Sequence, residues 1–244
     1  MERGEKVKLS ELPNESLRQR VAGTPDAEWF RKSGKMSVKN IETILNIIDT
    51  SFTDYPRALD FGCGCGRILV HMKDIGEKVE LYGVDIDTEA ISWAEKHIPW
   101  VKFSVNNPLP PLDYPDGYFD LIFNHSVFSH IDETYQDAWL AELSRITAPK
   151  GVVILTIHGD YVFSEHLKTQ NNTTIITSLT EERKTKGILF INSDGWNGIF
   201  PDFYHTSFHA PWYIFDHWSK YFNIKAYVTR GALDYQDYVL MYKK

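Results

Sequence analysis

The chain has 244 residues, a formal net charge of -7 and a sequence pI of about 5.7. This length is sufficient for one α/β domain with a sizeable hydrophobic core. The acidic balance argues against a nucleic-acid partner, because affinity for a phosphate backbone comes mainly from clustered Lys and Arg.

The N-terminal stretch and the cysteine content indicate a cytoplasmic protein. The first residues are charged and the sequence has no run of eighteen apolar residues, so we expect neither a signal peptide nor a membrane partner. Cys63 and Cys65 are one residue apart, a spacing at which a mutual disulfide is not expected. Nothing therefore indicates an oxidising compartment.

Residues 37–49 form the first predicted element, an amphipathic helix with Ser37 as its N-cap. Its apolar residues recur at helical spacing and define one buried face, namely Val38, Ile41, Ile44, Leu45 and Ile48. Residues 57–62 then predict a short buried strand that runs into a glycine turn. Residues 67–76 predict a helix that closes at Gly76.

Strand and helix signals continue to alternate toward the C-terminus. Strands are predicted at 79–86, 101–105, 118–128 and 151–159, and helices at 88–99 and 133–147. This alternation predicts an α/β fold with a parallel sheet and helices on both faces. Near the C-terminus, residues 223–230 and 237–243 predict two strands with a short link, hence an antiparallel hairpin.

The segment from 159 to about 212 departs from this alternation and predicts an insertion after the fifth strand. It carries polar patches followed by a stretch rich in aromatic residues. An excursion of this length inside a compact domain is usually functional or disordered, and the aromatic content favours function.

The stretch RALDFGCGCGRILVHM, residues 57–72, predicts a ligand site. Gly62, Gly64 and Gly66 allow positive φ and a close approach of backbone to ligand, and the following helix N-terminus offers free N–H groups. In open α/β sheets such a turn commonly contributes to a nucleotide site at the carboxyl ends of the strands. The dinucleotide fingerprint G-x-G-x-x-G fails, because its last position falls on Arg67, which argues against a nicotinamide dehydrogenase.

The spacing Asp60-x-Gly62-x-Gly64-x-Gly66 resembles the first motif of the class I S-adenosylmethionine-dependent methyltransferases. Later stretches resemble further blocks of that family in the same order: YGVDID, PLPPLDYPDGYFDLIFNHSVFSHI and AELSRITAPKGVVILTIHG. The resemblance covers about residues 57–159. It implies a Rossmann-like, seven-stranded, mostly parallel sheet with an antiparallel last strand, a domain over residues 37–244, and S-adenosyl-L-methionine as the cofactor.

The resemblance also implies roles for individual residues around the cofactor. The three glycines of the motif would lie beneath the methionine moiety, with Asp60 near its ammonium group. Asp85 would accept hydrogen bonds from the ribose hydroxyls, Ile86 would pack on the adenine face, and Asn124 would lie near the methionine end. The alternatives are a water-facing acid at Asp85, core packing for Ile86 and a loop contact for Asn124.

Two further features of the cofactor site stay open. Many relatives have an Asp after the third strand for the adenine amino group, whereas this chain has Asn106 and Asn107. An amide oxygen can accept the same hydrogen bond, but either residue could instead serve an ordinary turn. Arg67 could pair with a carboxylate of the cofactor or an acidic group of the acceptor, and the alternative is an arginine on a helix surface.

The two cysteines of the glycine turn do not predict a metal or redox site. A structural zinc site needs about four ligands at characteristic spacing, and the sequence has no second cysteine pair. We therefore predict no metal and interpret Cys63 and Cys65 as small side chains that fill a crowded loop.

Methyl transfer is an in-line displacement in which the protein mainly supplies alignment. A hydroxyl acceptor also needs a base for its proton, and histidine suits that task. The candidates are His158, at the end of the fifth strand, His130, after the fourth, and His205, in the insertion, with His125 and His209 nearby. The alternative for each is a hydrogen bond to a loop.

Two segments are expected to enclose the substrates. Residues 1–36 are expected to form a helical lid over the cofactor. Aromatic residues of the insertion are candidates for the wall of the acceptor pocket, with ordinary core packing as the alternative: Trp196, Phe200, Phe203, Tyr204, Phe208, Trp212 and Tyr213.

These observations predict methyl transfer from S-adenosyl-L-methionine to a small molecule or a saccharide, with O-methylation favoured over N-methylation. The chain lacks the Asn/Asp-Pro-Pro-aromatic signature of many methyltransferases that act on base amino groups, and reads NHSVF at residues 124–128. A nucleic-acid or protein methyltransferase and a non-catalytic cofactor-binding protein are the alternatives. The sequence predicts neither the identity of the acceptor nor the oligomeric state.

Overall fold

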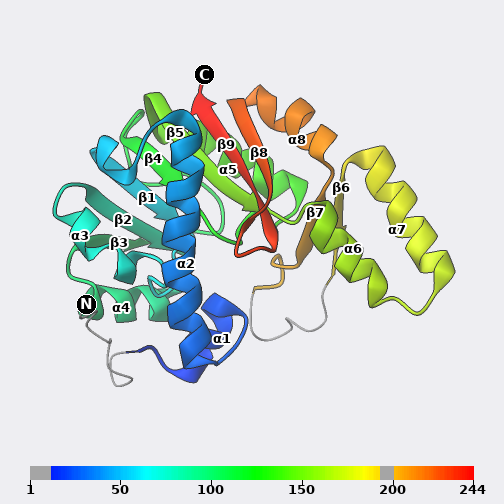
Figure 1. The fold of residues 1–244 in the computed structure, drawn as a ribbon, viewed down its shortest axis with the longest axis horizontal. Helices are drawn as coiled ribbons and strands as arrows, with labels where there is room; N and C mark the ends of the chain where they lie inside the picture. Colours follow the sequence, from blue (N-terminus) through cyan, green and yellow to red (C-terminus); the bar gives the residue numbers. More distant parts are fainter. Residues whose placement is uncertain (1–11, 193–200) are drawn as a thin grey trace.

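The computed structural model describes residues 12–192 and 201–244. A seven-stranded sheet in the order β3-β2-β1-β4-β5-β9-β8 forms the centre of the fold (Figure 1). Its strands are β1 (Arg57–Phe61), β2 (Glu80–Asp85), β3 (Val101–Val105), β4 (Phe119–Phe123), β5 (Thr147–Ile157), β8 (Phe222–Ala232) and β9 (Gln236–Lys243). The first five are parallel, whereas β9 runs antiparallel to both β5 and β8. The predicted mostly parallel sheet with an antiparallel last strand is confirmed.

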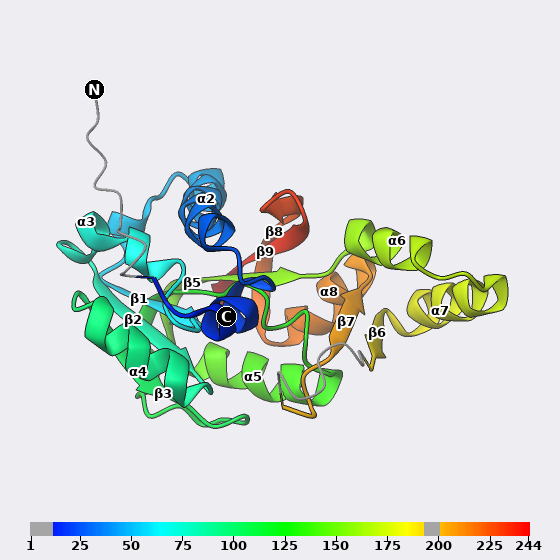
Figure 2. The ribbon, with the colours of Figure 1, turned by 90° about the horizontal axis from the view of Figure 1, so that it is seen from below.

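Helices cover both faces of this sheet, and Figure 2 shows α2 (Ala27–Leu45) and α5 (Glu133–Ile146) on opposite sides. The helix α4 (Thr88–His97) and the short α3 (Lys73–Gly76) pack on the same face as α2. The helix α8 (Pro211–His217) packs beside α5. Each face buries its own apolar cluster, typified by Ile41, Leu69 and Ile91 on one side and by Trp139, Leu143 and Ile214 on the other.

The prediction that Ser37 caps the first long helix is wrong. The helix α2 begins ten residues earlier, where the Asp26 carboxylate accepts hydrogen bonds from two N–H groups of the first turn. Ser37 is fully buried in the middle of this helix. A small residue is needed nearby as well, since a Cβ on Gly34 would lie 2.1 Å from the Arg67 carbonyl oxygen. The boundary predicted between residues 36 and 37 therefore lies inside α2.

The helix predicted at 67–76 is also interrupted. The chain forms a 3-10 turn at Leu69–His71 and only then the short helix α3. Met72 separates them with φ -107° and ψ 21°, outside the helical region, and its side chain is fully buried. Packing of this segment against the sheet thus overrides its helical pattern.

The insertion after β5 forms two helices and a separate small sheet. Its elements are α6 (Asp160–Lys168), α7 (Thr173–Lys186), β6 (Ile188–Ile191) and β7 (Thr206–His209), and β6 pairs antiparallel with β7. Figure 1 shows α6 and α7 projecting beyond the β8 side of the main sheet. Backbone hydrogen bonds attach β7 to the main domain, from Ser207 N–H to the Ser129 carbonyl and from His209 N–H to the His158 carbonyl, each 2.8 Å.

Within residues 12–192 and 201–244, no helix has the length and apolar character needed to cross a lipid bilayer.

Candidate functional site

A cavity of about 1200 Å³ lies at the carboxyl ends of β1, β2, β4 and β5. One side is formed by the glycine turn, the end of β2 and the helix α1 (Glu15–Ala22). The other side is formed by the insertion and the β8–β9 hairpin. Because the carboxyl ends of parallel strands meet at one edge, loops far apart in the sequence converge here.

The glycine turn requires glycine at all three motif positions. Gly62, Gly64 and Gly66 have φ of 77°, 54° and 76°, a region that other residues rarely adopt. There is also no room for a side chain, because a Cβ on Gly62 would lie 2.2 Å from Val127 Cγ2, and one on Gly64 would lie 2.6 Å from Val21 Cγ2. The turn therefore exposes bare backbone to the cavity.

Asp85 joins the end of β2 to the glycine turn. Its Oδ2 accepts a hydrogen bond from Gly64 N–H at 2.7 Å, and its Oδ1 accepts one from Asp87 N–H at 2.9 Å. Burial raises the pKa of this carboxyl, and the backbone hydrogen bonds oppose that rise. Asp85 and the following Ile86 both line the cavity, so a fixed carboxylate stands beside an apolar surface.

Asp60 and Arg67 are both buried close in sequence to the glycine turn, and the positive charge of Arg67 acts on the Asp60 carboxyl. Asp60 is 1% exposed, its Oδ1 has no hydrogen-bond partner in the described chain, and burial raises its pKa to about 8 although Arg67 acts to lower it. Arg67 is 6% exposed, donates to Ser33 Oγ at 3.0 Å and lines the cavity. The alternative of an arginine on a helix surface is wrong.

The structure separates the three candidate asparagines. Asn106 lines the cavity, its Nδ2 donates to the Asn107 carbonyl at 2.7 Å, and its buried Oδ1 has no partner in the described ranges. Asn107 does not line the cavity. Asn124 is fully buried outside the lining, where its Oδ1 accepts a hydrogen bond from Thr156 N–H at 2.8 Å.

His130 lines the cavity and is oriented by the insertion. Its Nδ1 donates to the His205 carbonyl at 2.7 Å, and its ring stacks on Tyr204 with centroids 4.6 Å apart. A hydrogen bond to a carbonyl places the proton on Nδ1, so Nε2 carries the lone pair. Burial lowers the pKa of His130 to about 4, and the ring is therefore uncharged at neutral pH.

His158 and His125 also line the cavity. The His158 ring centroid lies 5.3 Å from that of His130, and its Nε2 lies 3.1 Å from Gln236 Nε2. Burial lowers the pKa of both His158 and His125 well below the ordinary value. The cavity therefore contains imidazoles held in the neutral form.

The other two candidate histidines do not line the cavity with their side chains. The His205 ring packs 5.5 Å from the Phe190 ring, and its carbonyl accepts the hydrogen bond from His130. His209 is fully buried, with Nε2 3.0 Å from Gln136 Oε1, and burial lowers its pKa to about 3.

The predicted aromatic wall is present in part. Phe203, Tyr204 and Phe208 line the cavity, whereas Trp212 and Tyr213 do not. Tyr213 instead donates to Glu133 at 2.7 Å. Trp196 and Phe200 lie outside the described residues.

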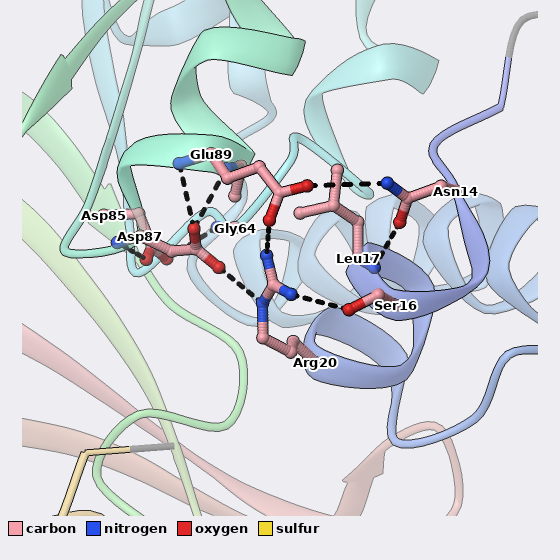
Figure 3. A network of polar contacts seen from close by, with 9 residues as sticks. Asn14, Ser16, Leu17, Arg20, Gly64, Asp85, Asp87 and Glu89 are labelled. Carbon is pink, nitrogen blue, oxygen red and sulfur yellow. Dashed lines mark hydrogen bonds and ion pairs between the residues drawn. The ribbon is translucent and has the colours of Figure 1, made fainter. Parts of the chain in front are cut away.

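Arg20 connects the helix α1 to the start of α4, as Figure 3 shows. Arg20 Nε lies 2.7 Å from Asp87 Oδ2, and its Nη2 lies 2.6 Å from Glu89 Oε2. Asp87 is also the N-cap of α4. Sequence reasoning missed this contact: the Asp87 cap had a recognisable signal, but nothing in the sequence pairs it with Arg20.

Both cysteines of the turn are free and buried. Burial raises the pKa of Cys65 to about 12 and that of Cys63 well above its ordinary value. A thiol that keeps its proton is a poor nucleophile and a poor metal ligand, so these side chains act here by packing.

Comparison with known proteins agrees with this architecture. Residues 59–155 match the methyltransferase domain family. A malonyl-acyl carrier protein O-methyltransferase of Halorhodospira halophila is 29% identical over 111 residues, covering 45% of this chain and 37% of that protein. A phosphoethanolamine N-methyltransferase of Arabidopsis thaliana is 28% identical over 127 residues, covering 50% of this chain and 25% of that protein. The chain thus spans less than half of the length of these curated relatives.

Solved structures share the fold over most of the chain. A protein of Pyrococcus horikoshii superposes with a TM-score of 0.59 at 18% identity, covering 85% of this chain and 89% of that one. An S-adenosylmethionine-dependent methyltransferase of Clostridium acetobutylicum gives 0.56 at 16% identity, covering 85% and 91%. Residues 59–155 therefore match a methyltransferase domain, and most of the chain shares the fold of solved S-adenosylmethionine-dependent methyltransferases.

Proposed function

We propose that this protein transfers a methyl group from S-adenosyl-L-methionine to a small-molecule acceptor. The observation that carries the proposal is the meeting, in one cavity, of a bare glycine backbone, a fixed carboxylate and neutral buried histidines. The first two features suit an adenosyl compound, and the third suits an acceptor that must lose a proton.

The cofactor end of the cavity supplies groups that match each part of S-adenosyl-L-methionine. Asp85 would accept the ribose hydroxyls and Ile86 would pack on the adenine. The unpartnered Oδ1 of Asn106 would accept a hydrogen bond from the adenine amino group, which favours Asn106 over Asn107. Arg67 would bind the cofactor carboxylate.

The methionine end involves groups that are fully buried. The buried Oδ1 of Asp60 has no hydrogen-bond partner in the described chain and suits the ammonium group, although Asp60 is not part of the cavity lining. Asn124 lies outside the cavity lining. Any effect of Asn124 on the methionine end would therefore be indirect, through the ends of β4 and β5 that this residue connects. When bound, the cofactor supplies a methyl group on a sulfonium, whose sulfur is already an activated leaving group.

His130 is the base in this proposal. Its Nδ1 hydrogen bond fixes the ring and leaves the Nε2 lone pair to accept the proton of an acceptor hydroxyl. His158 stands next to it as a second polar contact. The role of His205 in this proposal is its carbonyl, which orients the His130 ring.

The N-terminal segment acts as a lid in this proposal. Val21, Ala22 and Gly23 line the cavity beside the glycine turn, and Arg20 holds them there through Asp87 and Glu89. Residues 1–11 of the predicted lid lie outside the described residues. The two free, buried cysteines agree with the cytoplasmic location that the proposal includes.

O-methylation is favoured because the uncharged imidazole of His130 can accept the proton of a hydroxyl. The curated relatives include both O- and N-methyltransferases by name, so the acceptor atom rests on this chemistry alone. The net charge of -7 continues to disfavour a nucleic-acid acceptor.

Calorimetry of the purified protein with S-adenosyl-L-methionine and with S-adenosylhomocysteine tests the proposal. Heat with both compounds and none with NADH is expected. Transfer of a labelled methyl group to small hydroxylated molecules is then measured by mass spectrometry. Absence of binding to both adenosyl compounds would refute the proposal, and binding without any transfer would favour the non-catalytic alternative.

A further inference from the structure

The end of the cavity opposite the glycine turn has its own chemical character. We call it the acceptor end, and it is lined by His130, His158, Tyr161, Phe208, Tyr235 and Gln236. These residues come from the loop after β4, the end of β5, the insertion and the β8–β9 hairpin. Their chemistry restricts the acceptor, so the inference below rests on the proposed function.

Aromatic rings form most of the wall at the acceptor end. The His158 ring lies 5.7 Å from Phe208 and 6.1 Å from Tyr235, and the Tyr235 ring lies 6.1 Å from Tyr161 at 89°. Rings at such angles present flat faces and edges with which another ring packs favourably. This end is therefore suited to a planar, largely apolar body.

The charged side chains at the acceptor end are already paired within the described chain. Arg230 lies 4.0 Å above the Tyr161 ring and donates to Asp234 at 2.8 Å. Glu165 lies 2.5 Å from Lys168. A charged acceptor would have to compete with these partners or be desolvated without one, which is costly. An uncharged acceptor avoids that cost.

Two polar atoms at this end are buried and lack a hydrogen bond of normal geometry in the described ranges, namely His158 Nδ1 and Gln236 Oε1. The Ser207 backbone lies close enough to the His158 ring to act on its pKa. His158 is 6% exposed and Gln236 is 5% exposed. Gln236 Nε2 contacts Ser126 Oγ at 2.7 Å and His158 Nε2 at 3.1 Å. The Gln236 amide therefore donates to His158 Nε2, which places the imidazole proton on Nδ1.

The pair keeps one unsatisfied donor and one unsatisfied acceptor if the oxygen and nitrogen of the Gln236 amide are exchanged. The imidazole proton then moves to Nε2, and Nδ1 becomes an acceptor while the amide keeps an unpartnered donor. In either arrangement the pair leaves one donor and one acceptor unsatisfied. A hydroxyl group, which both donates and accepts, matches that requirement.

We propose that the acceptor is an uncharged aromatic compound with at least two oxygen substituents, of which one hydroxyl is methylated and another oxygen is bound by the His158–Gln236 pair. In the transfer step, the acceptor oxygen forms a bond to the methyl carbon as the carbon–sulfur bond breaks and its electron pair goes to sulfur. The hydroxyl proton passes to His130 Nε2. A saccharide is disfavoured, because its many hydroxyls would each need a partner that the aromatic wall does not supply.

A set of acceptors with S-adenosyl-L-methionine tests this inference on the intact protein. The probes are a naphthalenediol, a naphthol, a hydroxynaphthoate and methyl glucoside, with methylated product measured by mass spectrometry. We expect kcat/KM for the naphthalenediol to exceed that for the hydroxynaphthoate and the glucoside by about tenfold or more, a factor equivalent to about 1.4 kcal/mol. A preference for either of those two compounds would overturn the inference.

The variant Gln236→Leu separates recognition from folding. We expect it to raise KM for the naphthalenediol by about tenfold while changing KM for the naphthol much less, because only the diol has the second oxygen. Gln170→Leu is the matched control, since Gln170 follows α6 and does not line the cavity. An equal effect of Gln236→Leu on both probes would contradict the assigned contact.

Failure of the inference is distinguishable from failure of the proposed function. If calorimetry detects binding of S-adenosyl-L-methionine but the aromatic probes are not methylated, the acceptor class is wrong and the cofactor site stands. If no adenosyl compound binds, the proposed function fails and the inference fails with it.

Discussion

The two ends of the cavity are built in different ways. The cofactor end is made largely of backbone, from a continuous turn with three glycines and the adjoining end of β2. The acceptor end is made of side chains from four separate segments of the chain. A site made of backbone has strict sequence requirements at fixed spacing, whereas a site made of side chains can be assembled from any segments that meet in space.

The two ends of the cavity also differ in the charge of their side chains. The cofactor end is lined by the carboxylate of Asp85 and the Arg67 guanidinium, and the buried carboxyl of Asp60 lies outside this lining. In the proposed function these groups suit a zwitterionic ligand. The acceptor end contains the neutral imidazoles of His130 and His158 among aromatic rings. Changes at the two ends should therefore affect different measurements, namely cofactor affinity and turnover.

The largest effect is expected at the acceptor end, from His130→Gln. Loss of a general base typically lowers the rate by about 10²- to 10⁴-fold, and cofactor affinity should change little. Turnover at saturating cofactor is the measurement. His97→Gln is the control, since His97 lies at the end of α4 outside the cavity. His205→Gln should cost far less than His130→Gln, and an equal loss would show that the His205 side chain participates.

The next largest effect is expected at the cofactor end, from Asp85→Ala. The variant loses the carboxylate that is held by Gly64 and Asp87 N–H and that is proposed to accept the ribose hydroxyls. Hydrogen bonds to a charged group contribute about 1.5 to 3 kcal/mol each, so the Kd for S-adenosylhomocysteine should rise roughly 100-fold.

Asp120→Ala is the matched control for that measurement, since Asp120 also accepts a backbone hydrogen bond, from Arg57 N–H, but does not line the cavity. A melting temperature for each variant separates weak binding from unfolding. Unchanged affinity in Asp85→Ala would remove this carboxylate from the cofactor site.

Asp60→Asn should stabilise the ligand-free protein while weakening cofactor binding. The folded-state pKa of about 8 lies above the ordinary value of 3.8, so the native state holds a proton that the unfolded state releases. Stability is then lost as pH rises from about 4 to about 8, by at most about 1.4 kcal/mol per pH unit, and Asn removes this loss. At pH 7, about three pH units above the ordinary value, we expect a gain of up to about 4 kcal/mol.

Chemical denaturation of both proteins at several pH values provides the test. The advantage of Asp60→Asn should grow with pH over that window. A difference that does not depend on pH would mean that Asp60 has an ordinary pKa in the folded state.

The smallest effect is expected from Arg20→Ala in the lid. Ion pairs with partial exposure contribute about 0.2 to 1 kcal/mol, so cofactor affinity should fall only about two- to fivefold. The loss should shrink at high salt, because salt screens the attraction of Arg20 to Asp87 and Glu89. Lys39→Ala, on the exposed side of α2, is the control. A loss of cofactor affinity that does not depend on salt would argue against a role for the ion pairs of Arg20.

Prediction from sequence succeeded where local chemistry was decisive. The alternation of strands and helices fixed the parallel sheet, and the three glycines occupy left-handed backbone where other residues would be strained. It failed where packing decided, as at Ser37, which lies in the middle of α2, and at Met72, which interrupts the helix after β1. Local patterns do not contain the long-range contacts that set such boundaries.

By itself, the sequence determined the order of strands and helices, the conformation of the glycine turn and the acid at the end of β2. It did so because positive φ, hydrophobic periodicity and spacing act between neighbouring residues. Only the tertiary structure decided that Arg20 reaches Asp87, that the His205 carbonyl orients His130, and that Gln236 meets His158. Those contacts join residues 67 to 78 positions apart, and only the packing of the whole chain brings such residues together.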